Sequence, residues 1–322
     1  MSAPPNARHL LIPFAGRGSP ACRAALAGLR LPKLEALLAR LARVHEDTQD
    51  DSTRSPPHER ALAEALGIAA ADGCIPWAAL EAKRSGLGPT EGGQAWGVAT
   101  LCHWQVGIDD VMLGDPAAIQ IEAEESDALL AAALPFFEED GIALHASATP
   151  GRWLAQGPIF DGLATASIDR AVGFPISQWS PLSDAGRPLR RLQNEMQMLL
   201  YTERVNDART ARGVPPINSF WLSGTGALPA GFTVPQAGPT VADGLRTPAL
   251  RDDGAGWASA WQALDAGPVA ELLAACSAGE AVTLTLCGDR SAQRFAVRPR
   301  GLAAWAKGLF SRPTAASFLE AL

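Results

Sequence analysis

The sequence predicts an α/β protein whose mostly parallel sheet core is interrupted by a small inserted α+β domain. Three observations support this class. Hydrophobic residues make up 47% of the 322 positions and charged residues 19%, which provides enough apolar surface for a packed core. Strand and helix patterns alternate from about residue 201 onward, as is typical of a largely parallel sheet. Aromatic and β-favouring residues become frequent at about residue 95, where we expect the insertion to begin.

The core is therefore expected to comprise residues 1–94 and 201–322, with the inserted domain at residues 95–200. In the first core segment, the apolar run HLLIPF at residues 9–14 indicates a buried strand. Residues 33–44 place five apolar side chains on one helical stripe, which predicts a helix. The polar residues 45–57 indicate an exposed loop, and a second helix is expected over residues 58–66.

The inserted domain opens with AWGVATLCHWQVG at residues 95–107, whose aromatic and β-favouring residues indicate a strand. Further strands are expected at residues 111–113, 118–121, 142–146 and 152–155, and helices at 123–139 and 189–201. In the returning core segment we expect strands at residues 218–222 and 282–287, and a glycine-rich turn, SGTG, at 223–226.

Charge and composition limit which classes of partner the protein can bind and indicate its cellular compartment. Lys and Arg total 27 against 34 Asp and Glu, a net charge of −7, so the chain lacks the basic surface that nucleic acid or an anionic membrane requires. The longest apolar stretches, such as residues 10–15, are far shorter than the ~18 residues that span a bilayer. Five cysteines without a CxxC pair fit reduced thiols, which indicates the cytoplasm.

Local motifs for metal or cofactor chemistry are absent from the sequence. The five histidines form no HxH, HExxH or HxxxH pattern, and neither a GxSxG elbow nor a Walker loop occurs. We therefore predict no metal site and no cofactor.

Two segments carry polar groups suited to an anion. The backbone amides of SGTG could approach a ligand closely, although the segment could equally be a structural turn. NDARTARG at residues 206–213 predicts a short helix with Asn206 as its N-cap and Gly213 at its end. Arg209 in this helix is suited to bidentate recognition of phosphate or carboxylate, and the alternative is a solvated, salt-bridged helix.

His58 in SPPHERAL lies at the start of a predicted helix, where its side chain could face a cleft. Ser55 and the two prolines that follow it could equally serve only in helix entry and capping.

The string VNDARTARGVPPINSFWLSGTG at residues 205–226 resembles a stretch of archaeal-type cofactor-independent phosphoglycerate mutases. The matching positions are Asn206, Arg209, Gly213, Pro216, Asn218, Trp221, Gly224 and Gly226. LPKLEALLARL at residues 31–41 is similar to that family's TPNLDxLA helix, and Asp169 with Gly173 to its PHDixG stretch. The resemblance is collinear over nearly the whole chain. It implies an alkaline-phosphatase-like core.

The departures from that family lie at its catalytic positions. Its metal-binding Asp-Gly and Asp-His pairs correspond here to Pro13-Phe14 and Cys287-Gly288. Its nucleophilic serine corresponds to His58 or, with a three-residue gap, to Ser55. The resemblance therefore implies that two divalent ions cannot be held and that a phosphoryl relay through an activated serine loses its electrophilic support.

The combination of SPPHERAL, LQNEMQMLLY, PINSFWLSGTG and VTLTLCGD more closely resembles the RpfE-type regulatory proteins of proteobacteria, which are often labelled mutase-like. That resemblance implies cytoplasmic residence.

The resulting hypothesis is a degenerate, metal-free pseudoenzyme that binds a small phosphorylated or carboxylated metabolite in an interdomain cleft, in a regulatory role. The residues expected to face the ligand are Arg152, Asp169, Arg170, Asn206, Arg209, Asn218, Ser223, Gly224 and Gly226. One alternative is an active isomerase or phosphatase with His58 or Ser55 as an altered nucleophile. The other is a scaffold that grips a partner protein through the inserted domain.

Overall fold

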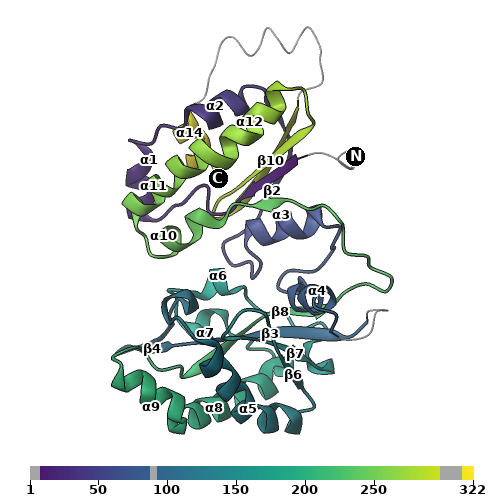
Figure 1. The fold of residues 1–322 in the computed structure, drawn as a ribbon, viewed down its shortest axis with the longest axis vertical. Coiled ribbons are helices and arrows are strands. Elements are labelled where there is room, and N and C mark those ends of the chain that lie inside the picture. Colours follow the sequence, from purple (N-terminus) through teal and green to yellow (C-terminus); the bar gives the residue numbers. More distant parts are fainter. Residues whose placement is uncertain (1–7, 88–92, 298–313) are drawn as a thin grey trace. The chain divides into compact units, whose positions relative to one another are not determined.

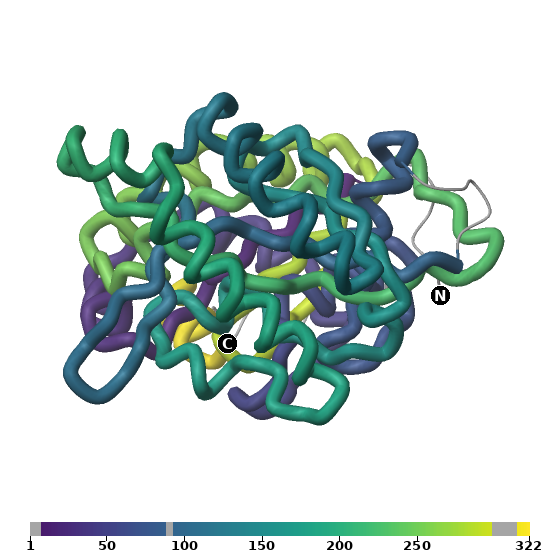
Figure 2. Tube along the Cα trace, turned by 90° about the horizontal axis from the view of Figure 1, so that it is seen from below, coloured from purple at the N-terminus to yellow at the C-terminus, as the bar shows by residue number. Residues whose placement is uncertain are grey.

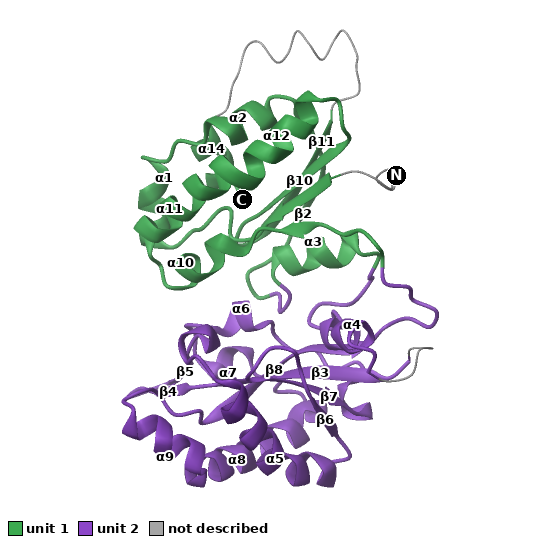
Figure 3. Cartoon of the chain, in the orientation of Figure 1, with its two compact units in different colours: residues 1–52, 56–67, 235–322 green, residues 53–55, 68–234 purple. Residues whose placement is uncertain are grey.

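A computed structural model describes residues 8–87, 93–297 and 314–322. The chain forms two compact units, shown in different colours in Figure 3. Unit 1 comprises residues 1–52, 56–67 and 235–322, and unit 2 comprises residues 53–55 and 68–234. Residues 68–94 and 201–234, which the sequence assigned to the core, thus belong to unit 2.

Unit 1 is built on a five-stranded sheet of order β2-β11-β10-β1-β9 (Figure 1). Its strands are β1 (Arg8–Ile12), β2 (Leu41–Thr48), β9 (Thr240–Val241), β10 (Val282–Cys287) and β11 (Ser291–Val297). β1 runs parallel to both β10 and β9, whereas β11 runs antiparallel to β10 and β2. The α/β class is confirmed: the centre of the sheet is parallel, and β11 and β2 make it mixed.

The two faces of this sheet differ in how they are covered. Leu10, Ile12, Leu284 and Leu286 join the main hydrophobic core with the helices on one face. Those helices are α1 (Pro20–Leu26), α2 (Pro32–Leu38), α10 (Arg246–Leu250), α11 (Gly254–Leu264), a π-helical segment (Asp265–Val269), α12 (Ala270–Ser277) and α14 (Ala315–Glu320). On the other face α3 (Pro57–Ala65) packs a small apolar cluster around Leu11, which confirms the helix predicted at residues 58–66.

The helix predicted over residues 33–44 is wrong in its second half. α2 ends at Leu38, and the chain re-enters the sheet as β2 from Leu41. Pairing with β11 overrides the helical spacing, because the backbone groups of residues 41–48 find partners across the sheet. The predicted loop at residues 45–57 therefore begins as strand and continues as loop only after Thr48.

Unit 2 holds an antiparallel sheet of order β6-β7-β3-β8 and a separate β4-β5 hairpin. The strands are β3 (Ala95–Cys102), β4 (Trp104–Val106), β5 (Val111–Leu113), β6 (Ala143–Ala146), β7 (Arg152–Gln156) and β8 (Ser219–Ala227). The strands predicted at residues 111–113, 142–146 and 152–155 are confirmed, and the single strand predicted at residues 95–107 is divided into β3 and β4, which belong to different sheets. The strand predicted at 118–121 is wrong: a 3₁₀ turn capped by Asp115 occupies Pro116–Ala118, and residues 119–121 form no strand.

The helices of unit 2 are α4 (Trp77–Arg84), α5 (Ala123–Glu139), α6 (Ile168–Ala171), α7 (Ile176–Trp179), α8 (Arg187–Thr202) and α9 (Arg204–Ala211). Short 3₁₀ turns occur at Pro158–Phe160 and Asp184–Gly186. The helices predicted at residues 123–139 and 189–201 are confirmed, and their apolar stripes enclose the core of unit 2 with β3, β7 and β8. Within the described ranges, no helix combines the length and the apolar character needed to cross a bilayer.

Candidate functional site

Segments far apart in the sequence meet around Ser55 in unit 2. The Ser55 hydroxyl accepts a hydrogen bond from the amide of Gly73 at 2.9 Å. The amides of Arg54 and Ser55 each donate to one carboxylate oxygen of Asp72, both at 2.9 Å. Three hydrogen bonds therefore hold the two segments together.

A third segment completes this arrangement. The amide of Thr165 donates to Gly73 O at 2.9 Å, and the amide of Ser167 donates to Arg54 O at 3.0 Å. The Arg170 guanidinium donates to Thr53 Oγ1 at 3.0 Å. We call Thr53, Arg54, Ser55, Asp72, Gly73, Thr165, Ser167 and Arg170 the Ser55 cluster. It contains two predicted site residues, Ser55 and Arg170, and the amide of a third, Asp169, donates to Ser167 Oγ at 3.3 Å.

Gly73 positions the Arg54 side chain. Its φ of +76° is in the left-handed region, and a Cβ there would lie 2.8 Å from Arg54 Cδ and 3.0 Å from Thr165 O. Only glycine therefore allows the arginine stem to lie against this backbone. The carbonyl oxygen of Trp179 accepts one of the five guanidinium N–H groups of Arg54 at 3.2 Å.

The SGTG segment contacts the Ser55 cluster through Thr225, but it is not a turn. It lies within β8, where Ser223 pairs with Val98 and Gly226 with Trp96, and the register shifts between these pairs. Thr225 donates to Leu163 O at 2.5 Å and lies 3.4 Å from Gly73 O. The prediction of a turn after residue 222 is therefore wrong, because cross-strand pairing with β3 extends the strand to Ala227.

The two SGTG glycines leave space for the nearby segment of residues 74–77. A Cβ on Gly224 would lie 3.1 Å from Trp77 Cβ, and a Cβ on Gly226 would lie 3.2 Å from Cys74 O. Both glycines have positive φ, which matches the close approach of the segment that leads into α4.

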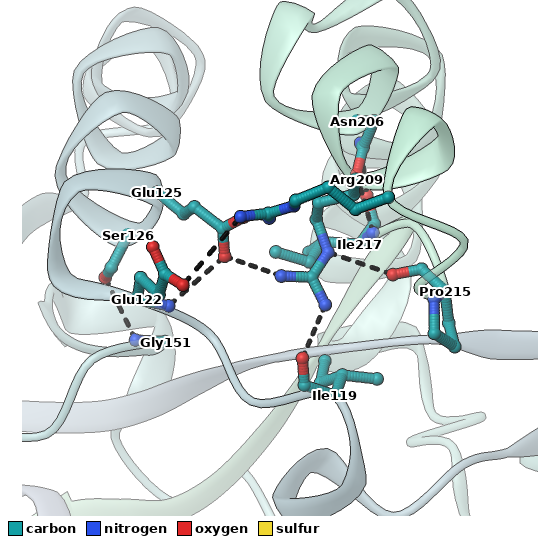
Figure 4. A network of polar contacts seen from close by, with 10 residues as sticks. Ile119, Glu122, Glu125, Ser126, Gly151, Asn206, Arg209, Pro215 and Ile217 are labelled. Atoms are coloured by element: carbon teal, nitrogen blue, oxygen red, sulfur yellow. Dashed lines mark hydrogen bonds and ion pairs between the residues drawn. The ribbon is translucent and has the colours of Figure 1, made fainter.

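Arg209 lies in a different polar network, drawn in Figure 4. Its guanidinium donates to Pro215 O at 2.9 Å, to Ile119 O and to the Glu125 carboxylate, and its side chain is 1% exposed. Arg212 also donates to Glu125. Burial raises the pKa of the Glu125 carboxyl, but hydrogen bonds from the Glu122 amide, Arg212 and Arg209 outweigh it and leave that pKa below its usual range. These contacts favour a structural role for Arg209.

The two predicted asparagines hold backbone groups. Asn206 donates to Leu200 O and Ile217 O and accepts from the Ile217 amide, each at 2.7 Å. Asn218 accepts from the Trp104 amide at 2.7 Å and donates to Trp104 O at 2.9 Å. The N-cap predicted at Asn206 is wrong, because α9 begins three residues earlier in the chain, after Glu203. Its predicted end is confirmed by Gly213, with a φ of +71°.

Two other predicted residues lie apart from the Ser55 cluster. Arg152 pairs with Glu81 at 2.8 Å, and the Ser147 hydroxyl donates to the same carboxylate at 2.6 Å. His58 belongs to unit 1, in the first turn of α3, where its ring packs on Phe14 with centroids 5.0 Å apart. Sequence reasoning missed Arg54 and Asp72. Their only signals are the adjacency of Arg54 to Ser55 and the turn-forming Asp72-Gly73 pair.

At the carboxyl ends of β1 and β10 in unit 1, where the sequence resemblance places the mutase family's metal-binding positions, the side chains of Phe14 and Cys287 offer no anionic ligand for a divalent ion. Burial raises the pKa of the Cys287 thiol, which keeps it protonated. The Asp289 carboxylate accepts hydrogen bonds from the Arg17 guanidinium at 2.5 Å and from the Gly18 amide at 2.8 Å. Over the described ranges, no group of three His, Cys, Asp or Glu side chains is placed to hold a metal ion.

Comparisons with known proteins find solved structures that align with most of this chain at low sequence identity. No protein-family model matches the chain, and no curated protein sequence matches it significantly. The cofactor-independent phosphoglycerate mutase from Thermoplasma acidophilum DSM 1728 aligns over 96% of this chain and 94% of its own, with 15% identity and a TM-score of 0.36. The PH0037 protein from Pyrococcus horikoshii aligns over 90% and 87%, with 13% identity and a TM-score of 0.42.

Proposed function

We propose that this chain binds a small phosphorylated or carboxylated molecule without converting it, in a regulatory role, and that the Ser55 cluster of unit 2 supplies the binding residues. One observation carries this proposal: the segments of Arg54 and Arg170 are joined by the backbone bond from the Ser167 amide to Arg54 O and by the bond from the Arg170 guanidinium to Thr53 Oγ1. Guanidinium groups bind phosphate and carboxylate in bidentate fashion, and prior fixing of the segments lowers the entropy cost of binding.

Arg54 is the better placed of the two arginines. Its stem rests on Gly73, one N–H bonds to Trp179 O, and its side chain is partly exposed. A ligand oxygen would find further N–H donors on the same group. The hydroxyl of Thr53, which already accepts from Arg170, lies on the adjacent residue.

Binding without turnover is supported by the chemistry of unit 1. The resemblance matches the metal-binding positions of phosphoglycerate mutases to Pro13, Phe14, Cys287 and Gly288 here, and the raised pKa of the Cys287 thiol keeps it protonated. A phosphoryl transfer of that type depends on electrophilic stabilisation by metal ions, which these residues do not supply.

A binding titration of an Arg54→Gln variant tests this proposal. Inorganic phosphate, 2- and 3-phosphoglycerate and citrate are screened by thermal shift, and the best ligand is titrated by calorimetry. We expect Arg54→Gln to weaken binding by about 1.5 to 3 kcal/mol, the range for a hydrogen bond to a charged group. Its melting temperature without ligand should stay close to that of the wild type.

Arg187→Gln is the matched control, since Arg187 is 77% exposed and pairs with Asp184 one helical turn away. It should leave the dissociation constant unchanged. A panel in which nothing binds, or a ligand whose affinity ignores Arg54→Gln, would reject the binding site and favour the scaffold.

A further inference from the structure

The C-terminal described segment of unit 1 covers the carboxyl ends of β1 and β10. These two strands are parallel neighbours, and α/β sheets generally bind ligands beyond the carboxyl ends of such strands. α14 packs against α1 and α2, and its trace is yellow in Figure 2. The residues after α14 reach the loops that follow both strands.

Two glycines in these loops leave no space between the sheet and the segment. A Cβ on Gly16 would lie 2.3 Å from Leu319 O and 2.8 Å from Leu322 Cβ. A Cβ on Gly288 would lie 2.5 Å from Leu322 C and O. The loop backbones are therefore in direct contact with the segment, which fills the position open to ligands in other sheets.

Ser291 holds the end of the segment through one oxygen atom. Its hydroxyl donates to Leu322 O at 2.8 Å, and its amide donates to the same atom at 3.3 Å. A backbone amide and a hydroxyl that converge on one oxygen are also the donors that bind one oxygen of a phosphate or a carboxylate.

The segment is anchored by few groups. α14 has six residues, too few for a helix that is stable by itself. It is held by the buried Ala315 and Leu319, by the Phe318 ring at 5.3 Å from that of Phe295, and by a bond from the Ala315 amide to Glu35. Such a segment can detach without unfolding the sheet.

Side chains of α11, rather than the C-terminal segment, hold the loop that follows β1. Trp257 and Trp261 donate their indole N–H groups to Phe14 O at 3.0 Å and Ala15 O at 3.2 Å. The Ala15 amide donates to Cys287 O at 2.7 Å. Phe14 keeps a φ of +54°, an uncommon value for a residue with a side chain, so the loop is held in one conformation.

We propose that residues 314–322 form a displaceable cap over the carboxyl ends of β1 and β10, and that a small oxyanion competes with the cap for the Ser291 donors. The chain thus closes its own strand-end site until an anion replaces the Leu322 oxygen. This inference concerns unit 1 alone and does not depend on the binding residues proposed in unit 2.

Hydrogen exchange of the full chain, read by mass spectrometry with inorganic phosphate as the probe, tests the cap. Without phosphate, residues 315–321 should exchange at least about tenfold faster than β10, because the cap opens locally. Phosphate should raise the exchange rate of these residues severalfold over chloride at equal ionic strength, because cap and anion compete. The Ser291→Ala variant should exchange faster in the cap yet lose the phosphate effect.

Ser277→Ala is the matched control, because that hydroxyl bonds only to Leu273 O within α12 in the described structure. It should behave as the wild type does in both buffers. Leu319→Ser, which weakens the cap without touching the donors, should tighten phosphate binding severalfold. Cap residues that exchange together with β10, or a cap whose exchange phosphate slows or leaves unchanged, would overturn the proposal.

Discussion

Arg209 shows how a single charged residue can link distant segments of unit 2. Its guanidinium connects α9 to Glu125 at the start of α5 and to the carbonyl oxygens of Ile119 and Pro215. The sequence correctly predicted a short helix ending at Gly213 around this arginine. It could not reveal the partner, because Glu125 precedes Arg209 by 84 positions and no local pattern relates the two.

We predict that Arg209→Ala lowers the free energy of unfolding by about 3 to 5 kcal/mol, because it breaks the ion pair with Glu125, which keeps Arg212 and the Glu122 amide, and takes a charged donor from two carbonyl groups. Urea denaturation measures the change. Arg187→Ala on the exposed side of α8 should change the same quantity by no more than about 0.5 kcal/mol. Equal, small effects of the two substitutions would return Arg209 to the set of ligand-binding candidates.

His9 in β1 makes the stability of the chain depend on pH. Burial, with a smaller effect of the Arg294 charge, lowers the pKa of His9 from 6.5 to about 4, while Glu64 acts in the opposite direction. Its Nε2 lies 2.8 Å from Thr285 Oγ1. The imidazole therefore stays neutral in the folded chain at pH values where it is protonated in the unfolded chain.

The free energy of unfolding should accordingly fall as the pH decreases from about 6.5 to 4, by at most about 1.4 kcal/mol per pH unit from this residue. Denaturation curves of wild type and His9→Gln over this range measure the effect. The difference between the two proteins should shrink or reverse toward pH 4. Parallel pH dependences would show that His9 is not buried as a neutral group.

At the scale of secondary-structure elements, the sequence predicts an element correctly where its local hydrophobic pattern is strong. The helices α5 and α8 were predicted because their long apolar stripes have one period and bury one face. The strand β2 was missed because its leucine and valine also fit a helical spacing, and only its pairing with β11 decides between the two. Local pattern alone cannot supply such long-range pairing.

SGTG shows the same limit at the candidate site. Glycine, serine and threonine in succession indicate a turn. Here they form the irregular part of β8, against which the segment of residues 74–77 packs closely. The Ser55 cluster joins residues 53–55, 72–73 and 165–170, and the sequence offered only two members of it, Ser55 and Arg170. Arg54 became a candidate only when its contact with Gly73 was known.

At the scale of the whole molecule, the two units divide the chemistry between them. Unit 1 has the mixed α/β sheet whose strand ends carry Phe14, Cys287 and the proposed cap. Unit 2 has the antiparallel sheet, the Ser55 cluster and all nine predicted ligand-binding residues.

The central claim is that the chain binds a small anion without converting it. Its most direct test is a ³¹P NMR spectrum of 3-phosphoglycerate with the wild-type protein, recorded with and without added manganese. We predict that the ligand signal broadens in the presence of protein and that no signal of 2-phosphoglycerate or inorganic phosphate develops in either sample. New product signals that grow with time and are suppressed by a chelator would contradict the account and identify an active enzyme.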